Sequence, residues 1–492
     1  MYSLGIDIGS SSVKVSLLDV ESGKCVASAG WPKSEAPIKA VRPGWAEQSP
    51  EDWWDYVLKA ISEIRQHHSL GGVKAVGITY QMHGMVAVDK DIRPVRDAII
   101  WCDSRAVGIG EEALEGIGYD RCMSHLLNSP GNFTASKLAW VLRNEPELCK
   151  KIRKYMLPGD YIAWKLTGEL ATTVTGLSEQ ILWDFKESRR ADFVAEYYGI
   201  DPALIPDTVP AIGFQARTTS DIEALTGIPA GTPICYRAGD QPNNAFSLDV
   251  LEPGEVAATG GTSGVVYGVT DVPKADKYSR VNTFVHVNDT PSAHRYGVLL
   301  CINGTGILNS WMRRTLAPEG ASYPEMNDIA ATAPVGSDGV RILPFGNGAE
   351  RMLGNRSPLC AIKGVDFNRH TRAHLLRAAQ EGIAFSFKYG IDIMKGLGLD
   401  LKVIRAGKAN LFLSPLFRTT LATLCRADIE LFDTDGSLGA ARGAALGAGL
   451  YHSAKEAFGT LSLLESVHQE PTWSEALGDA YSSWRDSLDK EL

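Results

Sequence analysis

The sequence predicts an α/β protein built from two related domains, and three observations lead to this fold class. Short apolar runs typical of strands alternate with helical patterns in both halves of the chain. A hairpin pattern with a glycine- and serine-rich turn, at residues 4–19, has a counterpart at residues 256–269. The length of 492 residues is ample for two domains that each bury a large apolar core. We therefore expect domains at residues 1–246 and 247–492.

The composition is that of an ordinary globular protein, with 44% hydrophobic and 22% charged residues. The net charge of −9 argues against nucleic acid or an anionic membrane as the main partner, because both require clustered positive charge. A local phosphate site built from backbone N–H groups stays compatible with this charge. The eight cysteines form no CxxC pair, and neither a spanning apolar run nor a secretory signal is recognisable. We expect a reduced protein located in the cytoplasm.

The first hairpin places a carboxylate beside a turn of small residues. Asp7 lies at the end of the apolar run 4–8 and directly precedes the turn 9–12. A carboxylate at the end of a strand, next to free backbone N–H groups, suits a hydrated Mg²⁺ and a phosphate. A turn aspartate that caps its own loop is the alternative interpretation.

The residues that follow predict a helix and then two strands around a polar turn. Ser49 is a typical N-cap, Pro50 a typical first helical residue, and apolar residues then recur at helical spacing. Strands are expected at residues 74–79 and 85–89, flanking the turn Gln-Met-His-Gly at 81–84. The histidine of this turn could bind a polyol hydroxyl, or it could be structural.

Two further acidic positions follow apolar runs. Asp103 comes after Trp101 and before Arg105, which permits either a binding role or an ion pair in a surface turn. Asp240 follows Gly239 near the expected domain junction, where a cleft would form, so it could act as a general base. An Asx turn is the alternative for Asp240.

Familiar nucleotide and metal motifs are missing. The chain has no GxxxxGK[ST] sequence, and the glycine pairs at 304–306 and 346–348 lack the third glycine of a dinucleotide fingerprint. The Gly-Gly-Thr-Ser-Gly run at 260–264 could instead cradle a phosphate, or it could be a plain hairpin turn. His370 and His374 have a helical spacing, but no HExxH accompanies them, so we expect them to face solvent.

The second half predicts a long helix at residues 371–395, a strand at 403–404 and a helix that restarts at Ser414-Pro415. A strand at 429–432 precedes a helix at 439–451 that is crowded with alanine and glycine. Such a helix permits close backbone packing.

Taken together and in this order, these segments resemble the FGGY family of carbohydrate kinases, and within it the xylulokinase branch. The resemblance covers essentially the whole chain. Its main segments are IDIGSSSVK at 6–14, GITYQMHGMV at 77–86, AGDQPNNA at 238–245, GGTSG at 260–264 and RAGKAN at 405–410. Others lie at residues 99–106, 132–141, 158–169, 175–185 and 364–386.

The resemblance implies two actin-like ATPase (ribonuclease H-like) domains with a cleft between them. It also implies phosphate transfer from ATP to a small sugar, with ATP and Mg²⁺ as cofactors. It would place the alanine- and glycine-rich helix near the adenine, whereas a tightly packed structural helix explains that pattern equally well. The oligomeric state is not fixed by the sequence, and a homodimer is one arrangement compatible with it.

By the same resemblance, Asp240 takes the proton from the sugar hydroxyl, and Asp7 and Asp240 hold Mg²⁺. The implied sugar site comprises Met82, His83, Trp101, Asp103, Asp240 and Gln241. The implied nucleotide site comprises Ser10, Ser11, Lys14, Gly261, Thr262, Ser263, Gly306, Gly407, Lys408 and Asn410.

Two residues depart from the xylulokinase pattern. Gln241 follows Asp240, as in glycerol kinases, and Lys408 stands where the nucleotide motif usually has glycine, so that it could reach a phosphate or point to solvent. Met82 and His83 argue against glycerol kinase, in which this turn typically carries Arg-Glu. The first expectation is therefore conversion of D-xylulose to D-xylulose 5-phosphate. The alternatives are another ketose or polyol, such as ribulose, an L-ketose or glycerol, and a non-catalytic sugar or nucleotide sensor of the same fold.

Overall fold

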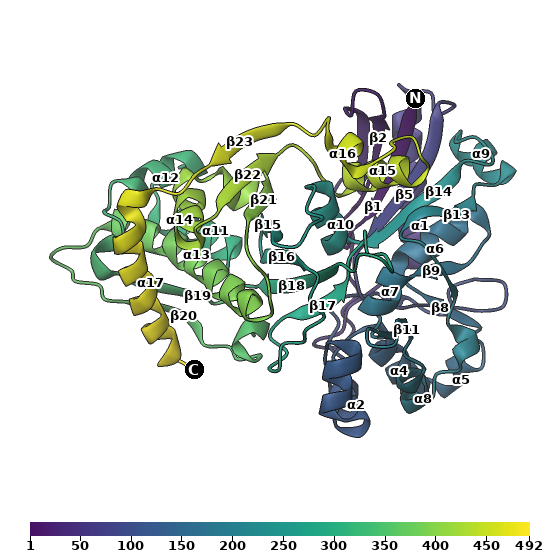
Figure 1. Ribbon diagram of the computed structural model, residues 1–492, viewed down its shortest axis with the longest axis horizontal. Coiled ribbons are helices and arrows are strands. Elements are labelled where there is room, and N and C mark those ends of the chain that lie inside the picture. The colour runs from purple at the N-terminus through teal and green to yellow at the C-terminus, as the bar shows by residue number, and fades with distance from the viewer. The chain divides into compact units, whose positions relative to one another are not determined.

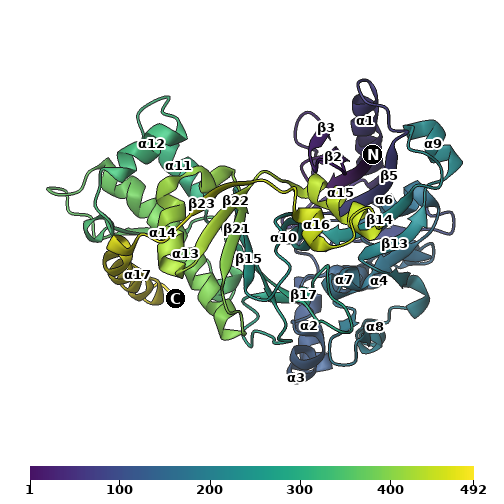
Figure 2. The ribbon, with the colours of Figure 1, turned by 45° about the horizontal axis from the view of Figure 1, so that its top comes forward.

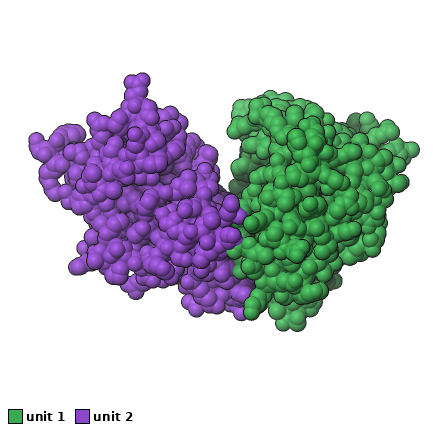
Figure 3. Space-filling view, turned by 90° about the horizontal axis from the view of Figure 1, so that it is seen from above, with its two compact units in different colours: residues 1–249, 284–296, 434–461 green, residues 250–283, 297–433, 462–492 purple.

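The computed structural model describes all 492 residues and divides them into two compact units. Unit 1 comprises Met1–Asp249, Phe284–Tyr296 and Thr434–Leu461, whereas unit 2 comprises Val250–Thr283, Gly297–Asp433 and Ser462–Leu492 (Figure 3). The first break in the chain follows Asp249, and two later segments return to unit 1. Both units combine helices and strands, which confirms the predicted α/β class.

A six-stranded sheet forms the centre of unit 1, in the order β13-β14-β5-β1-β2-β3 (Figure 1). These strands are β1 (Tyr2–Ile8), β2 (Val13–Asp19), β3 (Cys25–Trp31), β5 (Val73–Tyr80), β13 (Ile212–Arg217) and β14 (Pro233–Gly239). β1 and β2 are antiparallel, so the first predicted hairpin is confirmed. β1 and β14 both run parallel to β5, which places their carboxyl ends at the same edge of the sheet.

Two helices cover opposite faces of this sheet. α1 (Pro50–Arg65) begins at the predicted N-cap Ser49, whose Oγ accepts a hydrogen bond from the Asp52 backbone at 3.3 Å. Its apolar residues pack with Leu4 and Ile6 in one core.

α15 (Gly436–Gly447) packs on the other face, next to strands from the start of the chain (Figure 2). A Cβ on Gly5 would lie 1.8 Å from the Ser437 carbonyl oxygen, and one on Gly77 would lie 2.0 Å from that of Ala440. Helix and strands therefore meet backbone to backbone, and the alanine- and glycine-rich pattern is explained by close packing.

The other elements of unit 1 surround the sheet. Its helices are α2 (Val107–Ile117), α3 (Tyr119–Arg121), α4 (Thr134–Asn144), α5 (Pro146–Cys149), α6 (Pro158–Thr167), α7 (Val174–Glu179), α8 (Asp192–Tyr198), α9 (Ser220–Thr226), α10 (Asp240–Ser247) and α16 (Ala454–Phe458), with a π-helix at Cys122–Leu126. Short strand pairs join β4 (Glu47–Gln48) to β7 (Ala98–Ile99), β6 (Val86–Val88) to β8 (Lys154–Met156), β9 (Ala171–Thr173) to β12 (Asp207–Val209), and β10 (Trp183–Asp184) to β11 (Arg189–Arg190).

Unit 2 repeats the strand pairing of unit 1. Its seven-stranded sheet has the order β17-β18-β16-β15-β21-β22-β23. The strands are β15 (Glu255–Gly260), β16 (Gly264–Thr270), β17 (Asn282–Val285), β18 (Tyr296–Ile302), β21 (Val403–Gly407), β22 (Asp428–Phe432) and β23 (Leu463–Val467). β15 pairs antiparallel with β16 and parallel with β21, as β1 does with β2 and β5. The second predicted hairpin is confirmed.

The helices of unit 2 pack on this sheet around an extensive apolar core. They are α11 (Gly306–Leu316), α12 (Tyr323–Ala331), α13 (Arg372–Gly396), α14 (Pro415–Cys425) and α17 (Ser474–Asp489), with the strand pair β19 (Arg341–Phe345) and β20 (Leu359–Lys363) beside them. No helix in either unit has the length and apolar character needed to cross a membrane.

The expectation that His370 and His374 face solvent is wrong. Nδ1 of His374 accepts a hydrogen bond from the Thr371 backbone at 3.1 Å, and the His374 side chain is only 12% exposed. Nδ1 of His370 accepts from the Asp366 backbone at 2.8 Å. Both rings therefore stabilise the start of α13.

Candidate active site

The two acidic residues singled out from separate parts of the sequence, Asp7 and Asp240, come together in unit 1. Asp7 is the penultimate residue of β1, and Asp240 follows β14 directly as the first residue of α10. Because β5 lies between two parallel neighbours, the ends of β1 and β14 meet at one edge. The two carboxyl groups are close enough that the charge of Asp240 raises the pKa of Asp7.

Burial is the main cause of the perturbed acidity of both groups. It raises the pKa of Asp7 to about 7, with further increases from the Asp240 and Asp435 carboxylates and an opposing effect of the Lys14 ammonium. Burial also raises the pKa of Asp240 to about 6, against interactions with the Gln241 amides and the Met82 backbone that lower it. A carboxylate with a pKa near neutrality is suited to accept a proton from a substrate hydroxyl.

Asp435 is a site residue that the sequence analysis missed. Its Oδ2 binds the Lys14 ammonium at 2.5 Å, and its Oδ1 accepts the Leu438 N–H at 3.0 Å as the N-cap of α15. The Asp-Gly-Ser sequence before an alanine-rich helix is an N-cap signal that could have identified it. A Cβ on Gly436 would lie 2.3 Å from Asp7 Oδ2, so glycine is needed where Asp7 approaches this helix.

The turn between β5 and β6 lies against the strand end that carries Asp240. A Cβ on Gly239 would lie 2.5 Å from Cγ of the buried Met82. His83 has a left-handed backbone, with φ of 62°, and its Nδ1 forms a hydrogen bond with the Glu179 carbonyl oxygen at 3.0 Å. Its ring contacts those of Phe133 and Phe284, with centroids 4.7 and 5.6 Å away. The structure therefore brings Met82 and His83 to Asp240.

Two buried ionisable residues complete this region and were not anticipated. Lys137 on α4 donates a hydrogen bond from Nζ to the His83 carbonyl oxygen at 2.8 Å, and burial lowers its pKa to about 7. Glu179 ends α7, and burial followed by the charge of Asp240 raises its pKa well above the ordinary value. Both lie in segments of the resemblance, 132–141 and 175–185, but no local pattern singles out either residue.

Asp103 does not belong with this group. It is fully buried, and its Oδ2 accepts hydrogen bonds from the Ala46 N–H and from Arg105 Nη2, both at 2.6 Å. Its Oδ1 accepts the N–H and Nε–H of Arg105, both at 2.9 Å. Both carboxylate oxygens of Asp103 are therefore already hydrogen-bonded within the protein, and we do not retain Asp103 as a sugar ligand.

The turn of the first hairpin is held from several sides. Trp101, which is 54% exposed, donates from Nε1 to the Ser10 hydroxyl at 3.3 Å. The Ser10 carbonyl oxygen accepts from Gln48 at 2.7 Å, and that of Ser11 accepts from the Ala36 N–H at 2.7 Å. Trp101 thus lies beside the turn that follows Asp7.

In unit 2, a cavity of about 570 Å³ gathers four of the residues expected to bind nucleotide: Gly261, Thr262, Gly306 and Asn410. The Gly306 N–H donates to the Gly261 carbonyl oxygen at 3.1 Å, and a Cβ on Gly306 would lie 2.0 Å from that oxygen. The first turn of α11 begins here, and the N-terminus of a helix favours phosphate. The cavity is also lined by Gly260, Ile307, Asn309, Ser310, Arg314, Tyr323, Pro324, Asn327, Leu411, Leu413 and Ser414.

Ser263, Gly407 and Lys408 do not line this cavity. Lys408 instead forms an ion pair with Glu465, with Nζ 3.0 Å from Oε2, and its side chain is 38% exposed. The Lys408 charge is therefore already paired within unit 2.

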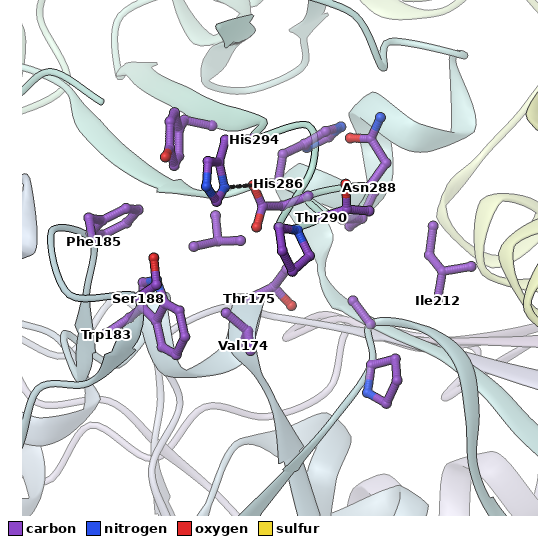
Figure 4. A pocket seen from close by; sticks show the side chains of 17 residues that line it. Val174, Thr175, Trp183, Phe185, Ser188, Ile212, His286, Asn288, Thr290 and His294 are labelled. Atoms are coloured by element: carbon purple, nitrogen blue, oxygen red, sulfur yellow. Dashed lines mark hydrogen bonds and ion pairs between the residues drawn. The ribbon is translucent and has the colours of Figure 1, made fainter. Parts of the chain in front are cut away.

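Unit 1 contains another cavity, of about 660 Å³, lined by aromatic and histidine side chains that include Trp183, Phe185 and His294 (Figure 4). Nδ1 of His294 pairs with Asp289 at 3.1 Å. None of the residues expected to bind sugar or nucleotide lines this cavity.

Comparisons with known proteins identify the family of the chain. The FGGY family of carbohydrate kinases matches with its N-terminal domain at residues 2–247 and with its C-terminal domain at residues 256–450. The chain is 28% identical to a xylulose kinase of Bacillus subtilis over 470 residues, covering 92% of this chain and 90% of that protein. It is also 28% identical to one of Escherichia coli over 485 residues, covering 98% and 95%.

Solved structures show the same fold. A xylulose kinase from Rhodospirillum rubrum has a TM-score of 0.89 at 23% identity, covering 100% of this chain and 99% of that one. A Plasmodium falciparum glycerol kinase with ADP has a TM-score of 0.88 at 20% identity, covering 100% and 98%. The expectation of two actin-like ATPase domains is thereby confirmed. With both family domains matched in order, the chain belongs to the FGGY family of carbohydrate kinases, and it is an ATP-dependent sugar kinase.

Proposed function

We propose that this kinase transfers the γ-phosphate of ATP to a hydroxyl of a ketose, and that D-xylulose is its substrate and D-xylulose 5-phosphate its product. The observation that carries the proposal is the meeting, within unit 1, of the Asp240 carboxylate with the Met82–His83 turn. The curated relatives named xylulose kinase, at 28% identity over most of the chain, support the choice of sugar.

Asp240 acts as the general base in this proposal. Its pKa of about 6 leaves it ionised at neutral pH yet basic enough to accept the proton of the attacking hydroxyl. Met82 and His83 contact the sugar and orient that hydroxyl, and Trp101 and Gln241 lie at the same edge of unit 1. Such positioning is most of what phosphoryl transfer requires from a protein, because the protein does little covalent chemistry.

In unit 2, Gly261, Thr262, Gly306 and Asn410 hold the nucleotide in the cavity that they line. The backbone N–H groups at the start of α11 and the Thr262 hydroxyl supply donors for phosphate oxygens. On unit 1, Ser10, Ser11 and Lys14 belong to the hairpin that follows Asp7 and are assigned to the transferred phosphate.

The residues around Asp7 fit a hydrated Mg²⁺. Asp240 and Asp435 both raise the pKa of Asp7, so a cation would relieve the repulsion among these carboxylates. The side chains form no cluster of three or more His, Cys, Asp or Glu that could hold a metal by itself. Mg²⁺ commonly takes one or two carboxylates and completes its shell with water and substrate phosphates, so we assign it to Asp7 and Asp240. When bound, it would neutralise charge on the transferred phosphate.

A second candidate is the same reaction on another ketose or polyol. Gln241 next to Asp240 favours this candidate, because the residue after the catalytic aspartate is also glutamine in glycerol kinases, according to the resemblance. A glycerol kinase also shares the fold, with a TM-score of 0.88.

The test is ADP release from Mg-ATP with D-xylulose, D-ribulose, L-xylulose, glycerol or gluconate, beside a tube without sugar. Turnover that strongly favours D-xylulose is the expected result. Turnover on another acceptor would move the substrate assignment to that compound. Equal release in every tube, or none in any, would contradict the proposed function.

A further inference from the structure

Glu179 lies beside the peptide that precedes Asp240, and although its segment, 175–185, belongs to the resemblance, no role is implied for it there. It is the last residue of α7, a helix capped by Thr173, whose Oγ1 accepts the Gly176 N–H at 2.9 Å. The Glu179 carbonyl oxygen pairs with His83 Nδ1 at 3.0 Å. Its backbone thus holds the turn that is assigned to the sugar.

The Glu179 carboxyl group lies next to Gly239, the residue that precedes Asp240. A Cβ on Gly239 would lie 2.8 Å from Glu179 Oε2 and 3.2 Å from Met82 Sδ. The carboxyl oxygen and the thioether therefore flank the same peptide, and Asp240 is the next residue in the chain.

One oxygen of this carboxyl group lacks a well-formed hydrogen bond. Glu179 is 2% exposed, and its Oε1 is buried without a hydrogen-bond partner. The Tyr80 hydroxyl, likewise without a well-formed hydrogen bond, lies close enough to interact with the carboxyl as a hydrogen-bond donor. The nearby Lys137 ammonium donates to the His83 carbonyl oxygen at 2.8 Å and forms no hydrogen bond with Glu179 Oε1. Buried polar atoms are almost always paired, and Oε1 lies beside the reactive group, so a ligand hydroxyl there would supply its partner.

We propose that the Glu179 carboxyl group binds a hydroxyl of the acceptor sugar next to the reacting one and thereby selects among polyhydroxy substrates. This inference rests on the proposed function, because it takes Asp240 and the Met82–His83 turn as the sugar site. A sugar hydroxyl can donate to one carboxyl oxygen and accept from a protonated one, so it satisfies Oε1 in either protonation state. Met82 offers no comparable donor at this position.

The experiment combines protein variants with substrates that lack single hydroxyls. Binding of D-xylulose, its 3-deoxy analogue and its 4-deoxy analogue is measured by calorimetry, without nucleotide, on the full-length wild-type protein and Glu179→Ala. Loss of the hydrogen bond should weaken D-xylulose binding roughly 10- to 100-fold. For the 4-deoxy analogue, which lacks the hydroxyl next to the reacting one, the same variant should cost less than about threefold, because the partner hydroxyl is already missing.

Three further variants serve as controls. Glu179→Gln retains a hydrogen-bonding side chain and should bind D-xylulose within about tenfold of wild type; it also serves if Glu179→Ala does not fold. Glu187→Ala removes an exposed glutamate a few residues further on and should change nothing. If Glu179 served only to hold Tyr80, Tyr80→Phe would reproduce the loss of affinity, with the same cost for every analogue.

Equal loss for D-xylulose and both analogues, or no loss at all, would overturn the assignment of Glu179. Sugar binding that follows the expected pattern in a wild-type protein that transfers no phosphate would contradict the proposed function and uphold Glu179 as a sugar ligand. Absence of any sugar binding by the wild-type protein would overturn both.

Discussion

Replacing Asp240 with asparagine should remove most phosphate transfer while leaving the fold at least as stable at neutral pH. A positioned general base contributes about 10²- to 10⁴-fold, which corresponds to about 3–5 kcal/mol of the activation barrier. Asparagine has nearly the same shape but cannot accept the proton. Sugar affinity should be largely retained, because the Met82–His83 turn is unchanged.

The expected stability change follows from the acidity of Asp240. Its pKa rises from 3.8 to about 6 in the folded protein, so the folded state holds this proton more tightly than the unfolded state. This contribution to the free energy of unfolding is present below about pH 4 and is lost as the pH rises to about 6. The difference of about 2 pKa units corresponds to at most about 3 kcal/mol, which the neutral asparagine does not lose.

Two measurements on Asp240→Asn check these values. ADP release with sugar should fall at least about 100-fold. Thermal unfolding in metal-free buffer should occur at the wild-type temperature or above it at pH 7, and the advantage should disappear near pH 4. Activity within tenfold of wild type, or a clear loss of stability at pH 7, would refute the role given to Asp240.

Four other outcomes are expected. In steady-state kinetics, His83→Ala should raise the KM for sugar by roughly tenfold or more and leave the KM for ATP almost unchanged; a change confined to ATP would contradict its place in the sugar site. Gly306→Ala should raise the KM for ATP and leave the KM for sugar almost unchanged, because its Cβ would lie 2.0 Å from the Gly261 carbonyl oxygen in the nucleotide cavity. Lys408→Ala should alter the KM for ATP less than about twofold, since Lys408 is paired with Glu465, and a larger rise would indicate phosphate contact. In a pH series, kcat/KM for sugar should fall about tenfold per pH unit below about pH 6 as Asp240 takes up its proton; a flat profile down to pH 5 would exclude it as the base.

Local features of the fold were predictable from the sequence. The helix that begins at Ser49 and both hairpins are encoded by capping residues, helical periodicity and glycine-rich turns within a few positions. Asp7 and Asp240 could each be singled out as acidic residues at strand ends. That they meet depends on the strand order β14-β5-β1, which no local pattern contains.

The missed residues belong to contacts between distant segments. Lys14 and Asp435 are 421 positions apart in the chain, and Glu179 joins His83 across 96 positions. The sequence left Asp103 open between a binding residue and an ion pair with Arg105, and the structure selects the ion pair. Burial decided that case, and burial of a single polar residue is not visible in a local pattern.

The most direct test of the central claim is the fate of the γ-phosphate when the protein is incubated with Mg-ATP and D-xylulose. Phosphorus NMR of the reaction should show one phosphomonoester per ADP, and carbon NMR of the product should show phosphorus coupling at C5 and C4, as in D-xylulose 5-phosphate. Inorganic phosphate in place of the ester, or an ester on a different carbon, would contradict the account.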